Sequence, residues 1–283
     1  MSDTSVAVGV DVGGTTTRAV LFDAEHSPIA SKSTPTPQGA DEIIDSVAAL
    51  VGQVIAEEPT PPAVVAVGVP GRVDVTNGIV GAAVNLGITE SVAMSDRLRA
   101  RLGVPVHLEN DVNVAALGAF VYFGLDQSAS LAYVNVGTGI AAGFVLGGRL
   151  LRGATGGAGE IGHIPMRPDG PPCPCGQIGC AEAVGSGRAV ATDAATDGDV
   201  VAAASWAVQL CVMTLDVDLV VVGGGMTNSG DQFRLRLVDA LAKSETASPM
   251  LAATGLARRV RLAPVDTPLA SLGAVLAARE AVT

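Results

Sequence analysis

Apolar runs, small-residue turns and helical stretches alternate along the chain. Near the N-terminus the apolar run 6–10 is followed by the turn DVGGTTT and a second apolar run, RAVLFD. This pattern predicts a β-hairpin closed by glycines. In the middle of the chain the runs 131–136 and 140–146 flank the turn GTG in the same order. The recurrence predicts two halves of related structure.

Helical and extended patterns continue to alternate outside the two hairpins. A helical stretch covers 40–58, and strand candidates lie at 63–70, 104–110 and 216–225. Alternating strands and helices are typical of an α/β architecture with largely parallel sheets. The sequence therefore predicts an α/β protein.

Composition narrows the class of protein. Hydrophobic residues make up 48% of the 283 residues and charged residues 16%, enough for one large or two medium cores. Gly, Pro or a charge breaks the apolar stretches before they approach the roughly 20 residues of a membrane span, and MSDTSVAVGVDVGG resembles no secretory signal. We expect a soluble, cytoplasmic protein with no membrane partner. A formal net charge of −11 without a Lys/Arg cluster argues against nucleic acid as a partner.

One polar stretch, EIGHIPMRPDGPPCPCGQIGC, concentrates metal-binding side chains. Cytoplasmic thiols stay reduced, so clustered cysteines there are more often metal ligands or catalytic groups than disulfides. Thiolates favour Zn²⁺, and four nitrogen and sulfur ligands make a closed structural site. The stretch supplies four: His163, Cys173, Cys175 and Cys180. A redox pair or idle thiols are the alternatives. Cys211 lies in the apolar stretch AVQLCVMTL and is expected in the core.

The glycine turns are suited to bind the phosphate groups of a nucleotide. A glycine turn after a buried strand presents backbone N–H groups unshielded by a Cβ, and two such hairpins could hold one nucleotide. A single glycine turn is more often only a turn, but the glycines 223–225 add a third candidate. The sequence GTGIAAG fits neither the P-loop spacing nor the G-x-G-x-x-G spacing. A different nucleotide fold is expected.

Eight motifs together resemble the ROK family and are similar to its bacterial glucokinases. In chain order they are DVGGTTTRAVLFD, VGVPGRVD, VNLG, ENDVNVAALG, GTGI, GGAGEIGH, CPCGQIGCAE and VVVGGGM. The resemblance implies an actin-like, ribonuclease H-like ATPase fold, with two α/β lobes around a cleft. The smaller lobe is expected at 1–115 with a C-terminal helix at about 268–283. The larger is expected at 116–267, with a zinc loop at 160–182.

The resemblance also implies an activity, the phosphorylation of a hexose by ATP with Mg²⁺. It assigns the general base to Asp111, which could accept the proton of the attacking hydroxyl, and Asn110 would orient that hydroxyl. Local sequence alone supports equally well that Asn110, Asp111 and Asn113 cap the following helix.

The resemblance extends to other positions of the site. Asp11 would organise Mg²⁺ and phosphate. Phosphate contacts are expected from Gly13, Gly14, Thr15, Thr138 and Gly139, adenosine contacts from Gly224 and Gly225, and sugar contacts from Gly71, Asn85, Asn110, Glu160, His163 and Glu182. His163 could ligate zinc with one ring nitrogen and a hydroxyl with the other. Isolated glutamates of this kind would otherwise be interpreted as exposed loop charges.

Three departures from the family pattern bear on activity. Ala141 and Ala142 stand where glycines are usual, Thr16 stands where many relatives have Lys, and the stretch 188–205 looks short. The alternatives to glucose phosphorylation are an N-acetylmannosamine or other hexose kinase and a catalytically weak sugar-binding protein. A ROK repressor would carry a helix-turn-helix before the first motif, and this chain is expected to lack one. The family also implies a homodimer or higher homo-oligomer.

Overall fold

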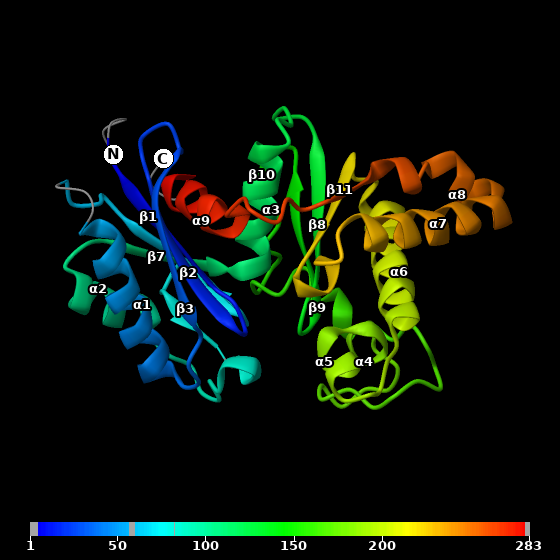
Figure 1. Cartoon of the computed structure of the whole chain (residues 1–283), viewed down its shortest axis with the longest axis horizontal. Coiled ribbons are helices and arrows are strands. Elements are labelled where there is room, and N and C mark those ends of the chain that lie inside the picture. The colour runs from blue at the N-terminus through cyan, green and yellow to red at the C-terminus, as the bar shows by residue number, and fades with distance from the viewer. Residues whose placement is uncertain (1–4, 57–59, 82, 281–283) are drawn as a thin grey trace. The chain divides into compact units, whose positions relative to one another are not determined.

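The chain folds into two compact units. The computed structural model describes residues 5–56, 60–81 and 83–280. Unit 1 comprises Met1–Phe123, Arg152–Gly157 and Pro268–Thr283, and unit 2 comprises Gly124–Leu151 and Ala158–Thr267 (Figure 1). The chain therefore passes from unit 1 to unit 2, returns for a six-residue segment, and ends in unit 1.

Unit 1 is built on a five-stranded sheet in the order β3-β2-β1-β4-β7. Its strands are β1 (Ala7–Val12), β2 (Thr16–Phe22), β3 (Pro28–Pro35), β4 (Val65–Val69) and β7 (Val106–Asn110). Its other elements are α1 (Ala40–Ile55), β5 (Val73–Asp74), β6 (Ile79–Val80), η1 (Val84–Leu86), α2 (Met94–Leu102), α3 (Asp111–Tyr122) and α9 (Leu269–Glu280). The first hairpin is antiparallel, and β4 and β7 add in parallel, as the sequence predicts.

Alternate strand positions in unit 1 bury two opposite faces of the sheet. Val8 and Val10 belong to a core that includes the apolar face of α1. Ala7, by contrast, belongs to a second core with Val114 of α3 and Val275 of α9. Because successive strand side chains point to opposite faces, the sheet lies between α1 and α9 (Figure 1). Burial on both faces explains the continuous apolar runs in these strands.

Unit 2 repeats the topology of unit 1. Its sheet has the order β10-β9-β8-β11-β12, with an antiparallel β8/β9 hairpin and parallel additions of β11 and β12. The strands are β8 (Ser130–Val136), β9 (Ile140–Leu146), β10 (Arg149–Leu150), β11 (Leu219–Gly223) and β12 (Val260–Leu262). The helices are η2 (Ile161–His163), α4 (Ala181–Gly185), α5 (Gly187–Ala191), α6 (Asp197–Leu215), η3 (Gly225–Thr227), α7 (Asp231–Ala247), α8 (Pro249–Thr254) and η4 (Ala257–Arg259). The predicted duplication is present in the fold.

Helix α6 is long and apolar enough to cross a membrane by length and composition. Its buried residues, including Val200, Ala204 and Val208, pack with β8 and β11 in the core of unit 2. The central helix of a globular core has the same composition as a membrane span. Core packing therefore accounts for the apolar character of α6.

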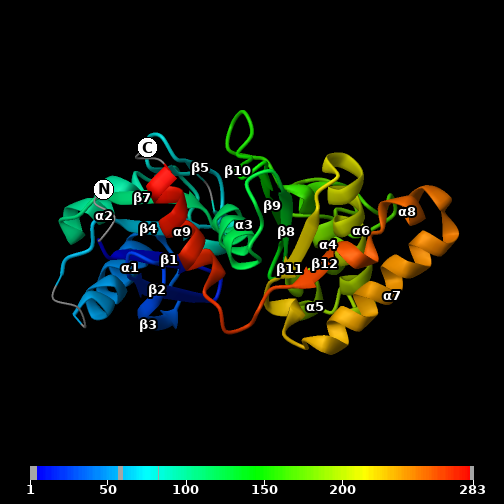
Figure 2. The same cartoon turned by 90° about the horizontal axis from the view of Figure 1, so that it is seen from above.

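Helix α3 contradicts the expected division at residue 115. It continues without a break to Tyr122, lies wholly in unit 1, and packs along α9 in both views (Figures 1 and 2). Its residues are apolar on nearly all sides, so the sequence carries no polar stripe that would assign it to one unit. The return of Arg152–Gly157 to unit 1 was also not foreseen.

The α3 and α9 backbones meet at glycines. A Cβ on Gly118 would lie 1.9 Å from the carbonyl oxygen of Leu269, and one on Gly273 would lie 1.7 Å from that of Val114. On the sheet, a Cβ on Gly9 would lie 1.9 Å from the carbonyl oxygen of Ser271. Helix α9 therefore packs on α3 and on the sheet of unit 1 through direct contact between backbones.

We expect Gly118→Ala to destabilise unit 1, because the new methyl group must push two helix backbones apart. Overpacking of a core costs about 1–3 kcal/mol and more when backbone has to move. Gly52→Ala is the matched control, since Gly52 lies on the exposed face of α1 with no atom within 4 Å of the added carbon. The control should gain up to about 1 kcal/mol from helix propensity. Urea unfolding of both variants measures the difference, and equal stability of the two would refute the close approach.

Candidate functional site

The first glycine turn joins β1 to β2 and is tied to the end of β3. The Gly13 N–H donates to the carbonyl oxygen of Thr16 (3.0 Å), and the Thr36 hydroxyl donates to that of Gly13 (2.8 Å). The Thr36 N–H donates to the carbonyl oxygen of Thr15 (3.0 Å). These bonds hold Gly13–Thr15 in one conformation before any ligand binds.

Asp11 lies at the end of β1, just before this turn. Its partner across the hairpin is Arg18. Burial raises the pKa of the Asp11 carboxyl from 3.8 to about 6, although the positive charge of Arg18 lowers it. A carboxylate whose charge is this poorly solvated is well suited to meet a cation.

The second glycine turn, Gly137–Gly139, is held by the segment that follows the cysteine loop. The N–H of Gly187 donates to the carbonyl oxygen of Gly137 (2.7 Å), and that of Arg188 to the carbonyl oxygen of Thr138 (3.2 Å). Glu182 on α4 accepts a hydrogen bond from the Ile140 N–H (3.0 Å), directly after the turn. The cysteine loop and the second turn are therefore parts of one structure.

Gly224 and Gly225 follow β11, the parallel neighbour of β8. Gly223 pairs with Asn135 in the sheet, so the turns after both strands emerge at the same edge. Gly224 has a φ of 97°, and a Cβ there would lie 2.6 Å from the Val136 backbone. Only glycine fits this conformation and this space. Unit 2 thus brings the predicted phosphate and adenosine glycines together.

In unit 1, Asn110 ends β7 and caps α3. Its Oδ1 accepts from the N–H groups of Val112 (2.9 Å) and Asn113 (3.1 Å), and its Nδ2 donates to the carbonyl oxygen of Gly71 (3.1 Å). The capping role that sequence left open for Asn110 is therefore present. Asp111 is the first residue of α3, so Gly71, Asn110 and Asp111 form one cluster.

Asn85 is not hydrogen-bonded to that cluster within the described residues. It belongs to the exposed 3₁₀ turn η1, and its carbonyl oxygen accepts from the Gln38 side chain (3.3 Å). No hydrogen bond among the described residues joins it to Gly71 or Asn110.

Glu160, His163 and Glu182 converge in unit 2. His163 Nε2 lies 3.9 Å from Glu160 Oε2. Partial desolvation raises the pKa of Glu160; His163 opposes this rise, and the negative charge of Glu182 adds to it. Two carboxylates and an imidazole at this spacing offer several acceptors and one donor to a polyhydroxy ligand.

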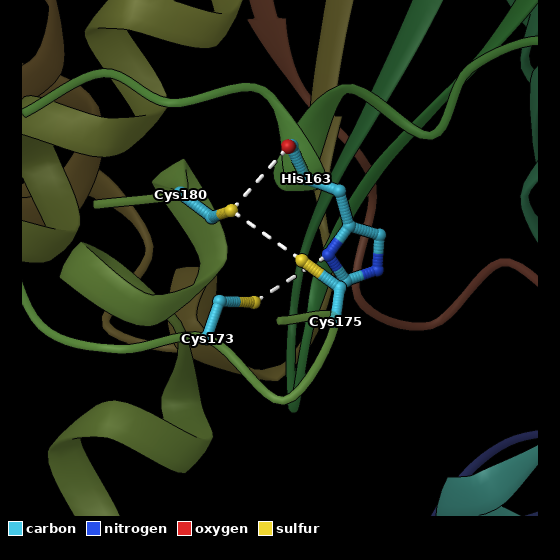
Figure 3. Close-up of side chains that lie close together, drawn as sticks. All are labelled: His163, Cys173, Cys175 and Cys180. Carbon is cyan, nitrogen blue, oxygen red and sulfur yellow. Dashed lines mark hydrogen bonds between the residues drawn. The ribbon is translucent and has the colours of Figure 1, made fainter. Parts of the chain in front are cut away.

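The opposite edge of the His163 ring faces the thiols. Cys173 Sγ lies 3.6 Å from His163 Nδ1, and Cys175 Sγ lies 3.6 Å from Cys180 Sγ (Figure 3). All four ligand atoms lie within 4.8 Å of one another. Ligands of a tetrahedral zinc with bonds of about 2.0–2.3 Å are separated by about 3.5–3.8 Å. The four side chains therefore fit a zinc ion.

Burial raises the pKa of the Cys180 thiol to about 12. By contrast, the Gln177 backbone N–H, with its side chain, lowers the pKa of Cys175 to about 6. Gln177, which sequence reasoning missed, also donates from Nε2 to the His163 carbonyl oxygen (2.8 Å). Its place between Cys175 and Cys180 was the feature of the sequence that could have identified it as part of the cysteine cluster. A divalent cation would favour the thiolate of Cys180 as well.

Known proteins are similar to this chain in sequence and fold. Residues 7–210 match the ROK family. The glucokinase of Streptomyces coelicolor is 36% identical over 188 residues, covering 65% of this chain and 57% of that protein. The glucokinase of Thermotoga maritima is 30% identical over 301 residues, covering 88% of this chain and 94% of its own.

A solved structure extends the match to the whole fold. The ROK family glucokinase from Streptomyces griseus, in complex with glucose and AMPPNP, superposes with a TM-score of 0.80 at 26% identity, covering 97% of this chain and 99% of its own. This match confirms the predicted fold class, two α/β lobes of the actin-like ATPase type. The family match spans more than half of the chain, so the chain belongs to the ROK family.

Proposed function

We propose that the chain is an ATP-dependent hexose kinase that phosphorylates the 6-hydroxyl group, with glucose as the preferred sugar. The observation that carries the proposal is the hydrogen bond from the Ile140 N–H to Glu182. It joins a carboxylate suited to sugar hydroxyls to a glycine turn suited to phosphates. A site that must bring a hydroxyl to a phosphoryl group needs these two functions in contact.

Asp111 is proposed as the general base. Its place at the end of β7 and the start of α3 gives it a fixed backbone. A carboxylate in hydrogen-bond reach of the sugar hydroxyl accepts its proton as the phosphoryl group is transferred. Asn110 is then a positioning residue, because its Oδ1 already caps α3.

The remaining roles divide between the turns and the loop. The proposed phosphate groups are Gly13, Gly14, Thr15, Thr138 and Gly139, with Gly224 and Gly225 beside adenosine. Asp11 is proposed to help bind Mg²⁺, whose charge would neutralise developing negative charge on the phosphates. Gly71, Asn85, Glu160, His163 and Glu182 are proposed to contact the sugar.

We propose a structural zinc ion held by His163, Cys173, Cys175 and Cys180. When bound, zinc would lock the loop and the orientation of the imidazole. The contact between His163 Nδ1 and Cys173 Sγ supports Nδ1 as the zinc ligand, and Nε2, which lies near Glu160, would then be available to a sugar hydroxyl. The proposed oligomer, a homodimer or larger, rests on the family alone.

A coupled assay for ADP release with a panel of hexoses tests the function. We expect glucose to give the highest kcat/KM. If N-acetylmannosamine exceeds glucose tenfold, the sugar assignment is wrong but the kinase assignment stands. If no hexose is phosphorylated while glucose still binds, the chain is a sugar-binding protein.

Asp111→Asn should lower kcat about 10²- to 10⁴-fold, because the amide keeps the shape of the side chain but cannot accept a proton. Sugar affinity, measured calorimetrically, should stay within about threefold, a change below 1 kcal/mol. Asp231→Asn is the matched control, since Asp231 is also the first residue of a helix and is exposed. Near-normal turnover in Asp111→Asn would assign the base elsewhere.

Elemental analysis of protein purified without added metal should find one zinc per chain. Cys175→Ser should lose the metal and melt about 5–10 °C lower, because the ion stabilises only the folded loop. Cys211→Ala removes a thiol from the core of unit 2 and should retain the metal. The proposed zinc site would be contradicted if the parent protein is purified without metal and melts at the same temperature as Cys175→Ser.

Asp11 should make metal-free stability depend on pH. Because its folded pKa of about 6 lies above the ordinary 3.8, the folded state holds the proton longer and this group's stabilisation is lost as pH rises toward and through 6. Asn does not titrate, so the free energy of unfolding of Asp11→Asn should not fall in this way. Relative to the parent, it should rise by about 1 kcal/mol from pH 5 to 7.5. Urea unfolding midpoints of both proteins between pH 5 and 7.5 measure this difference. A constant difference would show that Asp11 does not titrate there.

A further inference from the structure

We propose that Arg152 and Glu109 are a positioning pair that holds the start of α3, and with it Asp111, in the geometry needed for phosphoryl transfer. The inference rests on the proposed function, because it takes Asp111 to be the base. Neither residue belongs to the glycine turns, the sugar-binding groups or the zinc loop.

Glu109 is a buried carboxylate with three hydrogen-bond partners. It is 1% exposed. Its Oε2 accepts from Arg152 Nε (2.6 Å), and its Oε1 accepts from the Asn110 N–H (3.0 Å) and from Asn113 Nδ2 (3.0 Å). A buried carboxylate is tolerated only when paired and hydrogen-bonded in this way. Removing Arg152 would leave that charge without its cation.

The contacts of Glu109 lie on both sides of Asp111. Asn110 precedes Asp111 and Asn113 follows it by two positions, and both bond to the same Oε1. Asn110 in turn caps α3. The backbone of Asp111 therefore runs between two points fixed by one carboxylate. A displacement of about 1 Å in a reacting group can cost about a hundredfold in rate, so the orientation of Glu109 bears on catalysis.

His107 does not compete for this role. It lies two residues before Glu109 on β7, on the same face of the strand. Burial lowers the pKa of His107, although the charge of Glu109 raises it. The imidazole is therefore uncharged near neutral pH, and the positive charge in contact with Glu109 is that of Arg152.

Arg152 comes from the segment that returns to unit 1. The same segment, Arg152–Gly157, is tied a second time, because Arg72 Nε donates to the Thr155 carbonyl oxygen (2.7 Å). A Cβ on Gly156 would lie 2.9 Å from the Val73 carbonyl oxygen, so the backbone also packs closely. Arg152 is thus presented to Glu109 from a docked segment.

The test compares Arg152→Ala, Arg152→Lys and Glu109→Gln with the parent chain in steady-state assays with glucose and ATP. The alanine and glutamine variants should lose about 10- to 100-fold in kcat, with calorimetric glucose affinity within threefold. Arg152→Lys should recover part of kcat. The double variant should lose no more than the worse single variant, because both remove one interaction. Arg99→Ala, which removes an exposed ion pair with Asp96 in unit 1, should leave kcat unchanged.

Hydrogen exchange tests the positioning role of Arg152 and Glu109 separately from the proposed kinase activity. In Arg152→Ala the amides of 110–114 should exchange at least tenfold faster, while those of β1 and β4 stay protected. Folded variants with kcat within twofold of the parent, or with unchanged exchange at α3, would overturn the positioning role. A parent that phosphorylates no hexose would overturn the proposed function instead, and exchange would still decide whether the pair holds the start of α3. Assays well below each variant's melting temperature remove any contribution from unfolding.

Discussion

Helices α3 and α9 approach so closely that neither can carry a side chain at its contact glycine. Gly118 meets the carbonyl oxygen of Leu269, and Gly273 meets that of Val114. The first residue of α3 is Asp111. The direction of that helix, and hence of the proposed base, therefore depends on a helix contributed by the far end of the chain. Backbone contact leaves little freedom to slide or tilt, since no flexible side chain lies between the helices to adjust.

Glu109 constrains the first turn of α3. The α9 contact fixes the body of the helix, whereas Glu109 and Asn110 fix its first turn. A first turn has N–H groups without intrahelical partners, so it frays unless side chains satisfy them. The two constraints act on different parts of the helix. Together they give the carboxylate proposed as the general base a rigid backbone although it stands at a helix end.

Periodicity and spacing predicted much of this molecule. Two hairpins, their parallel additions and the cluster of His163 with three cysteines all follow from local patterns that need no tertiary partner to be recognised. The Arg152–Glu109 pair could not be predicted, because it joins residues 43 positions apart through a segment that returns to unit 1. The division expected at residue 115 falls inside α3, because the face that this helix packs on α9 consists of glycines and small apolar residues and carries no pattern that assigns it to one unit. Such contacts depend on chain path, which local sequence does not encode.

The two units share a topology but support their glycine turns differently. In unit 1 the Thr36 hydroxyl and N–H, at the end of β3, hold the turn directly. In unit 2 the corresponding edge strand, β10, has only two residues, and the turn is held instead by Glu182, Gly187 and Arg188. Cys180 stands at the N-cap position of α4, directly before the helix that carries Glu182. The proposed zinc ion, by fixing Cys180, would therefore stabilise the second glycine turn, which is proposed to bind phosphate, as well as the loop. This gives a physical reason for placing a structural metal beside the proposed site.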